Sequence, residues 1–484
     1  MNKEQLYAYL DERTELLSGI SDRIWEYAET AFEEHRSAAL LCDTLRAAGF
    51  TVEEGVADIA TAFRASFGSG HPVIGLLAEY DALAGLNQKA SCARRMPTAP
   101  EDAGKAGHGC GHNLYGTAAV GAAMAIKKYL EETGKPGTVM VFGCPGEEGG
   151  SGKAFMARDG VFDSLDVALA WHTGTFNSIV SGSSLANVQV LYKFYGVAAH
   201  ASSAPENGRS ALDAVELMNM GTQFLREHME DADRVHYAIT NSGGYSPNVV
   251  QARADVLYLI RSPKSSNVKS LFERVNNIAH GAAMMTGTRV EIDFIKGCSE
   301  RLRNDTMARL TYKNMEEAPL PTYTEEEYAF AREVQLSYEN PKDVMADVTR
   351  RCGQVNRPKL MELYKDDPSL TPFLLPYFEN DVVSKGSTDV GDVTWVCPTS
   401  SFTAVSTAVG TPGHSWQYVT CNRSSIAHKG LLYAAKVLCG TAVDLLNSPE
   451  TVQAAKEEHA RRSGGAPYVC PIPKGVRPRA IADL

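Results

Sequence analysis

A nearly continuous apolar run ends in acidic residues at Pro72-Val73-Ile74-Gly75-Leu76-Leu77-Ala78-Glu79-Tyr80-Asp81. Such a run is typical of a central strand that is covered on both faces, with Asp81 at its C-terminal end. Further strands are predicted at residues 138–144 and 167–172, and helices at residues 114–132 and 153–158. Alternating strands and helices predict an α/β domain with a mostly parallel sheet and helices on both faces.

Length and composition limit the possible functions. A chain of 484 residues is too long for one ordinary core, and 44% hydrophobic with 22% charged residues is a globular composition. Lys and Arg number 47 against 58 Asp and Glu, a net charge of −11, so we expect no nucleic-acid and no membrane partner. The N-terminus lacks a signal-peptide pattern, and ten cysteines follow no regular framework. These features predict a cytoplasmic protein with mostly inert thiols.

Residues that commonly bind metals lie in four short segments. Cys110 and His112 stand two apart in Gly107-His108-Gly109-Cys110-Gly111-His112-Asn113, where the glycines let the backbone approach an ion. Glu148 follows the strand at 138–144, His172 closes the next strand, and His414 lies far along the chain. Alone, the Cys-Gly-His tripeptide would be read as a tight turn with a buried thiol. The other ligands favour a metal site, because ligands gather at the C-terminal ends of parallel strands.

One thiolate, three imidazoles and a carboxylate exceed what one four-coordinate ion needs. We therefore predict two divalent ions, and the donor set fits zinc or manganese. Two ions roughly 3.5–4 Å apart lower the pKa of a water between them. We assign Glu148 as a ligand and Glu147 as the general base, although spacing alone does not order this pair. Asp81 is predicted to orient a ligating imidazole, with capping of the following turn as the alternative.

The pattern changes between residues 186 and 298. Strands are predicted at 187–195, 234–240, 252–261 and 289–295, and helices at 209–228 and 265–285. The order β-α-β-β-α-β predicts a ferredoxin-like α+β module that is inserted into the main domain. Because His414 follows the module, we expect a catalytic domain made of residues 1–185 and 299–484, with a lid at 186–298. Residues 324–327 form a capping box, whereas residues 357–379 are expected to be irregular.

The chain resembles the aminoacylase/carboxypeptidase superfamily of dinuclear metallohydrolases, in its amidohydrolase branch. The matching motifs are the Gly107–Asn113 segment and residues 145–150, 199–201, 208–211, 247–250, 387–392, 410–414 and 468–473. The resemblance implies that Cys110, His112, Glu148, His172 and His414 are ligands, with Glu147 as base and Asp81 as orienting acid. It also implies that the lid is a dimerisation domain whose His200 stabilises the oxyanion in the partner's active site. From the residues alone, His200 would be an ordinary surface residue.

Two lid residues are predicted to hold the α-carboxylate of the substrate. Arg261 ends a strand and Asn248 lies in the connection before it, so both are expected at the lid edge that faces the metals. Without the resemblance, Arg261 would simply pair with an acid of the lid and Asn248 would cap a turn. Asn113 and the pair Thr388-Asp389 stand where relatives of this kind carry acidic residues, so pKa values and substrate contacts are expected to differ.

The resulting hypothesis is a metal-dependent amidohydrolase. It would cleave an N-acyl or N-aroyl amino acid, or a small dipeptide, and would act as a homodimer or with a related subunit. One alternative is a non-catalytic subunit that supports an active partner, but such a subunit has no reason to retain Glu147. A second alternative is a thiol enzyme with Cys110 as nucleophile and His112 as base, which leaves three further ligands unexplained.

Overall fold

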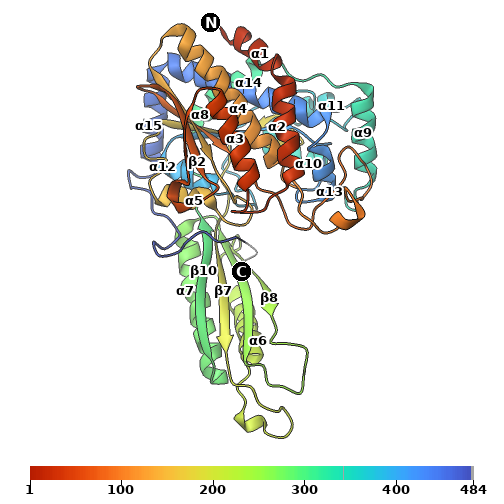
Figure 1. The fold of residues 1–484 in the computed structure, drawn as a ribbon, viewed down its shortest axis with the longest axis vertical. Coiled ribbons are helices and arrows are strands. Elements are labelled where there is room, and N and C mark those ends of the chain that lie inside the picture. The colour runs from red at the N-terminus through yellow and green to blue at the C-terminus, as the bar shows by residue number, and fades with distance from the viewer. Residues whose placement is uncertain (342, 481–484) are drawn as a thin grey trace.

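A seven-stranded sheet forms the centre of the larger domain in the computed structural model, which describes residues 1–341 and 343–480 (Figure 1). The strand order is β1-β2-β4-β3-β5-β11-β6. The central strands β3 (Val73–Ala78), β4 (Gly137–Gly143), β5 (Val167–Gly174) and β11 (Thr399–Val405) are parallel. The outer strands β1 (Thr51–Glu54), β2 (Phe63–Ser69) and β6 (Ser178–Ile179) pair antiparallel. The predicted α/β class with a mostly parallel central sheet is confirmed.

Helices cover both faces of this sheet. Trp171 of β5 points toward α4 (His112–Thr133), where its indole N–H donates to the Tyr115 carbonyl at 3.0 Å. The strand register places Phe142 on the opposite face, and its ring packs on Phe162 with centroids 4.9 Å apart. Helix α14 (Ser425–Asn447) packs beside α4, whereas α5 (Gly152–Arg158) and α12 (Val390–Val396) pack together on the Phe142 side.

The remaining helices of the larger domain surround this sandwich. The N-terminal helices are α1 (Lys3–Asp11), α2 (Thr14–Tyr27) and α3 (His35–Ala47). The C-terminal segment contributes α8 (Asp305–Glu317), α9 (Glu325–Leu336), α10 (Val344–Cys352), α11 (Arg357–Leu363), α13 (Trp416–Cys421) and α15 (Pro449–Arg462). The capping box at Thr324 and Glu327 is present at the start of α9. Helix α11 shows that the irregular stretch expected at 357–379 is wrong for its beginning, because Pro358 occupies the first turn, where a missing N–H is harmless.

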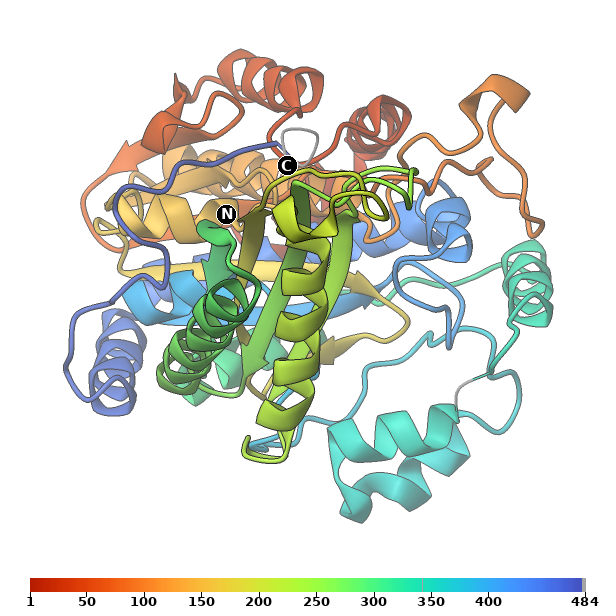
Figure 2. The ribbon, with the colours of Figure 1, turned by 90° about the horizontal axis from the view of Figure 1, so that it is seen from below.

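The second domain, the lid, is a four-stranded antiparallel sheet in the order β10-β7-β9-β8. Its strands are β7 (Ala186–Tyr195), β8 (Arg234–Asn241), β9 (Arg253–Ser262) and β10 (Arg289–Cys298). Helices α6 (Ala211–Arg226) and α7 (Ser265–Thr286) lie beside each other on the sheet (Figure 2). Their apolar faces enclose a separate core that includes Val190, Tyr258 and Val275. The prediction of a separate ferredoxin-like lid domain is confirmed.

The lid projects from the larger domain, so it has a base and a tip (Figure 1). Asn187, Arg261 and Cys298 are paired neighbours at the base. The other end of β7 lies roughly 25 Å away at the usual rise per strand residue. The C-terminal tail crosses the junction between the domains, where the Arg479 guanidinium pairs with Asp293 of β10 at 2.7 Å. The last four residues of the tail, 481–484, lie outside the described residues.

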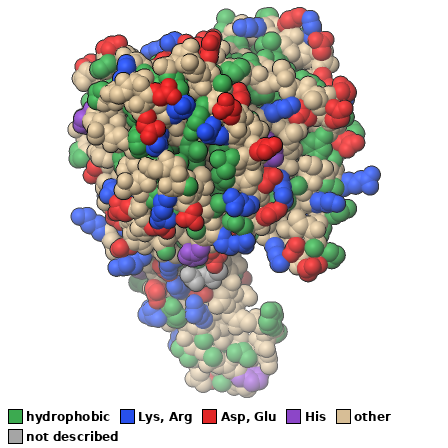
Figure 3. Space-filling view, turned by 45° about the horizontal axis from the view of Figure 1, so that its top comes forward, with side chains coloured by type: hydrophobic (Ala, Val, Ile, Leu, Met, Phe, Trp, Pro, Cys, Tyr) green, Lys and Arg blue, Asp and Glu red, His purple; other side chains and the backbone are tan. Residues whose placement is uncertain are grey.

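One helix among the described residues, α14, is long and apolar enough to cross a membrane, with a mean hydropathy of 1.2. Inside the folded protein, 89% of that stretch is buried, as is typical of a core helix. On the face of the molecule in Figure 3, acidic and basic side chains are interspersed over the larger domain.

Candidate metal centre and active site

The five predicted ligands meet at the C-terminal ends of the parallel strands. A cavity of about 370 Å³ opens there, between the sheet and the base of the lid. Its walls include Cys110, Glu147, Glu148, His172 and His414 from the catalytic domain. His112 is fully buried behind them. These side chains therefore gather where ligands of parallel sheets are expected.

Local backbone geometry brings Cys110 and His112 to the site. Gly111 adopts a left-handed φ of 79° as the N-cap of α4, and a Cβ there would lie 2.6 Å from the Thr173 side chain. Only glycine tolerates this conformation and close approach together. The turn sets the Cys110 sulfur 3.4 Å from His172 Nε2 on the neighbouring strand β5.

Asp81 connects two of the predicted ligands. One carboxylate oxygen lies 2.8 Å from His112 Nδ1, and the other accepts the backbone N–H of Glu148 at 2.9 Å. The first contact turns His112 Nε2 toward the cavity, as expected of an acid that orients a metal-binding imidazole. Although burial opposes ionisation, the charge of His112 holds the pKa of Asp81 below its ordinary value.

His414 reaches the same place from a distant loop. Its Nε2 lies 3.2 Å from a Glu148 carboxylate oxygen, and its backbone N–H donates to the Gly109 carbonyl at 3.1 Å. His414 adopts a left-handed φ of 55°, which is uncommon for a residue with a side chain. Backbone strain of this kind concentrates at functional sites, where surrounding contacts hold it.

The donor atoms are close enough to share ions. Cys110, His112 and His172 form one group within 4.8 Å of one another, and Cys110, Glu148 and His414 form a second. His112 Nε2 and Glu148 Oε1 are buried, and neither makes a hydrogen bond with a described residue, because Glu79 and His414 lie 3.2 Å from them without hydrogen-bond geometry. Leaving such atoms unpaired costs about 1–3 kcal/mol each, so the arrangement fits a role as cation ligands.

Electrostatics at the site also favour bound cations. Burial raises the pKa of Cys110 well above its ordinary value. Burial raises the pKa of Glu147 as well, and the neighbouring carboxylates of Glu79 and Glu148 raise it further. A nearby cation would stabilise the charged form of each of these groups.

A buried ion-pair cluster beside the ligands was not found from the sequence. Lys153 Nζ lies 2.7 Å from Glu79 and 2.6 Å from Asp389, and none of the three side chains is more than 1% exposed. Glu79 also lies 3.2 Å from His112 Nε2. The available signal was the spacing of Glu79 and Asp81, because alternate residues of an extended segment point the same way. Asn113, by contrast, donates to the Ser21 hydroxyl at 2.9 Å, away from the cavity.

The lid places its predicted residues in two different regions. Arg261 lines the cavity and donates to the Ser387 hydroxyl at 3.5 Å, with no carboxylate at ion-pair distance in the described chain. Asn248 and His200 instead lie together at the tip, where the Asn248 carbonyl accepts the Ala201 N–H at 2.9 Å. The expectation that Asn248 and Arg261 share one lid edge is wrong within a single chain, because strand β9 runs the length of the lid between them.

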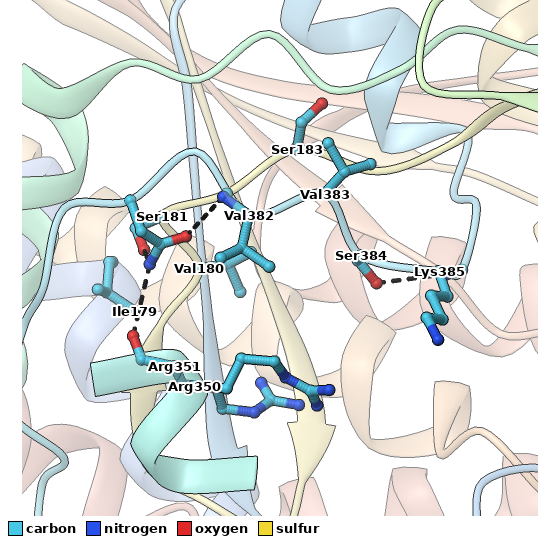
Figure 4. Close-up of a pocket in the computed structure, with 13 residues that line it drawn as sticks. Ile179, Val180, Ser181, Ser183, Arg350, Arg351, Val382, Val383, Ser384 and Lys385 are labelled. Carbon is cyan, nitrogen blue, oxygen red and sulfur yellow. Dashed lines mark hydrogen bonds between the residues drawn. The ribbon is translucent and has the colours of Figure 1, made fainter. Parts of the chain in front are cut away.

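A second cavity of about 400 Å³ adjoins the first (Figure 4). The two share Val180 and Gly386 in their walls. Arg350 and Arg351 from α10 face this second space, with Val382 and Lys385 on another segment (Figure 4).

Residues 75–355 match peptidase family M20/M25/M40, and the chain belongs to this family of amide-bond hydrolases. A p-aminobenzoyl-glutamate hydrolase subunit of Escherichia coli is 48% identical over 99% of this chain and 100% of that protein. The Xaa-Arg dipeptidase of Mus musculus is 29% identical, over 93% and 90%. A dinuclear metal-binding peptidase of the M20 family from Bacillus subtilis shares the fold, with a TM-score of 0.55 and 15% identity over 90% of this chain and 99% of that one. Divalent metals are in keeping with the family and the donor groups.

Proposed function

We propose that this chain hydrolyses the amide bond of an N-acyl or N-aroyl amino acid of the p-aminobenzoyl-glutamate kind, or of a small dipeptide. The observation that carries the proposal is the convergence of five ligands and Glu147 on one cavity that Arg261 closes from the lid. The names of the two relatives support it, since p-aminobenzoyl-glutamate and Xaa-Arg dipeptides both end in an amino acid.

The proposed metal centre holds two divalent ions, zinc or manganese. Its ligands are Cys110, His112, Glu148, His172 and His414, which supply two overlapping donor groups. When bound, such ions polarise a carbonyl and lower the pKa of water. Asp81 keeps His112 in the orientation that ligation requires.

Proton transfer falls to Glu147 in this proposal. It takes the proton of the attacking water and delivers it to the leaving nitrogen. Glu147 lines the cavity, and one of its carboxylate oxygens lies within 4.8 Å of donor atoms of His112 and Glu148.

Arg261 holds the α-carboxylate of the substrate. Its Nε is buried without a hydrogen-bond partner among the described residues, so the guanidinium has donors to offer. A planar guanidinium matches the two oxygens of a carboxylate, which fixes the direction of the amide relative to the metal ligands.

The lid is proposed as the dimerisation surface. Apolar side chains are exposed on α6, where Met220 is 56% and Phe224 is 68% exposed. Strand β8 forms an open edge of the lid sheet that carries the exposed residues Tyr237 and Ile239. Association through such a surface hides apolar area and pairs a free strand edge.

Dimerisation would also give the tip residues a role. His200 and Asn248 lie too far from their own cavity to act there, so we place them in the site of a partner subunit. The partner is a second copy or a related chain, in keeping with the name of the Escherichia coli relative, which is one subunit of a hydrolase. The division into residues 1–185, 186–298 and 299–484 and a cytoplasmic location belong to the same proposal, and the free cysteines support that location.

A metal and turnover assay tests this function. The purified chain, loaded with zinc or manganese, should cleave members of a panel of acyl-amino acids and hold two ions by elemental analysis. Chelation should abolish turnover, and metal but not reductant should restore it, which also separates this proposal from a Cys110 thiol enzyme. His172→Ala should lower the metal content. One ion at saturation, or turnover that survives chelation, would contradict the proposal.

A further inference from the structure

The cavity is lined by the acidic residues Glu79, Glu147, Glu148 and Asp389, at the proposed metal centre and beside Lys153, and also by three basic side chains. Arg261 and Lys296 line it from the base of the lid, and Arg301 lines it from the segment after β10. Among the residues that the structure describes, none of the three has a carboxylate at ion-pair distance. Lys296 donates only to the Glu148 carbonyl, at 3.4 Å. Together, these three cations are suited to an anion with more than one negative group.

Arg301 is the least satisfied of these cations. Its backbone is fixed, since its N–H donates to the Ser184 hydroxyl at 3.3 Å and its carbonyl accepts the Ser183 hydroxyl at 2.7 Å. Its guanidinium donates no hydrogen bond to any described residue. Burial lowers the pKa of Arg301 to about 10, and Tyr115 is the ionisable group beside it. The Arg301 side chain is partly accessible, lines the cavity and has no acidic partner among the described residues, so an anionic ligand in the cavity can pair with it.

Tyr115 supplies a second unsatisfied group next to Arg301. The side chain is 1% exposed, and its hydroxyl has no hydrogen-bond partner in the described part of the chain. Its ring is held by Trp171, with centroids 6.0 Å apart, and by the edge of His172 at the same distance. The Tyr115 side chain lines the same cavity as Arg301 and is held there by these rings.

We propose that Arg301 and Tyr115 determine specificity by binding a second carboxylate, on the side chain of the amino acid that is released. Arg261 of the lid and Arg301 of the catalytic domain, which line the same cavity, then bind the two carboxylates of a dicarboxylic amino acid. The proposal rests on the amidohydrolase function above and narrows its substrates to N-acyl derivatives of acidic amino acids. A basic side chain at the same place would face the charge of Arg301 and be rejected.

Matched substrates test the proposal on the metal-loaded full chain. The 4-aminobenzoyl derivatives of L-glutamate and L-glutamine differ only in the charge of the side chain. Wild type should prefer the glutamate derivative. Arg301→Gln should lower kcat/KM for it by about 10- to 100-fold, the usual worth of a charge-assisted hydrogen bond, and change the glutamine derivative by less than about threefold.

The variant Tyr115→Phe separates an effect on substrate recognition from an effect on the stability of the fold. Because the hydroxyl has no partner in the free protein, its removal should leave the unfolding midpoint unchanged or raised. The same variant should still lose about tenfold in kcat/KM on the glutamate derivative. Arg350→Gln, in the adjoining cavity, is the matched control and should keep the wild-type preference.

Calorimetry gives a readout that does not depend on turnover. L-glutamate should bind the wild-type chain more tightly than L-norvaline, and Arg301→Gln should remove the difference. Equal losses on both aminobenzoyl substrates, a preference lost in Arg350→Gln instead, or no preference for L-glutamate binding would overturn the role of Arg301. A wild-type chain that binds L-glutamate in this way but cleaves nothing would overturn the proposed function and leave the binding site standing.

Discussion

Replacing Lys153 with Met should strongly destabilise the catalytic domain. The lysine is completely buried and contacts two buried carboxylates, Glu79 and Asp389. Burial opposes its charge, but these carboxylates hold the pKa of Lys153 well above its ordinary value. Methionine fills a similar volume, so the main effect is the loss of the cation. Removing one partner of a buried ion pair lowers the free energy of unfolding by about 3–5 kcal/mol. Because Lys153→Met leaves two buried carboxylates without their cation, its cost should lie at the upper end of this range.

The loss should depend on pH, and urea unfolding of the metal-free protein at pH 8 and pH 5.5 measures it. Without the lysine, two buried negative charges remain without a counter-charge, and burial and mutual repulsion disfavour them. Acid neutralises such charges, so the cost of removing the lysine is relieved at low pH and is fully present at high pH. The deficit of Lys153→Met relative to wild type should therefore be larger at pH 8.

Lys436→Met is the matched control. Lys436 is also largely buried, but its partner Asp11, 2.7 Å away, has a side chain that is 54% exposed. The carboxylate left behind is hydrated, so the control should lose less than about 1 kcal/mol. The reasoning would be refuted if Lys153→Met lost no more unfolding free energy than the control, or if its loss were the same at both pH values.

Three further outcomes are expected. Glu147→Gln should lower turnover by about 10²–10⁴-fold at unchanged metal content. Loss of metal from this variant would show instead that Glu147 is a metal ligand. Mixing His200→Ala with Glu147→Gln chains should regenerate activity in hybrid dimers, and no recovery after proven subunit exchange would remove His200 from the partner's site. Although burial opposes it, hydrogen bonds from the backbone of Asp305 and Thr306 lower the pKa of Glu458 to about 2. Its contribution to stability is present above about pH 4.5 and is lost toward pH 2, so denaturation should show Glu458→Gln costing about 2–3 kcal/mol at pH 7 and little at pH 2.

Local patterns in the sequence predicted the fold class, which the structure confirms, and the proposed ligand set. The run before Asp81 and the strands near Glu148 and His172 have the apolar character of buried parallel strands, and their C-terminal ends meet at one edge. The lid elements followed from their periodicity in the same way. The helices before residue 50 and the antiparallel strands β1 and β2 were not predicted, although they complete the catalytic domain.

The sequence by itself determined which residue types stand at the strand ends, because strand character and ligand spacing are local properties. Only the tertiary structure decided which distant side chains meet. Lys153 reaches Asp389 across 236 residues, and packing alone sets such a contact. The antiparallel course of β9 separates Asn248 from Arg261, although they are near in sequence. The tertiary structure also buries the Tyr115 hydroxyl without a hydrogen-bond partner among the described residues and places Tyr115 and Arg301 on one cavity, an arrangement that the spacing of residues does not show.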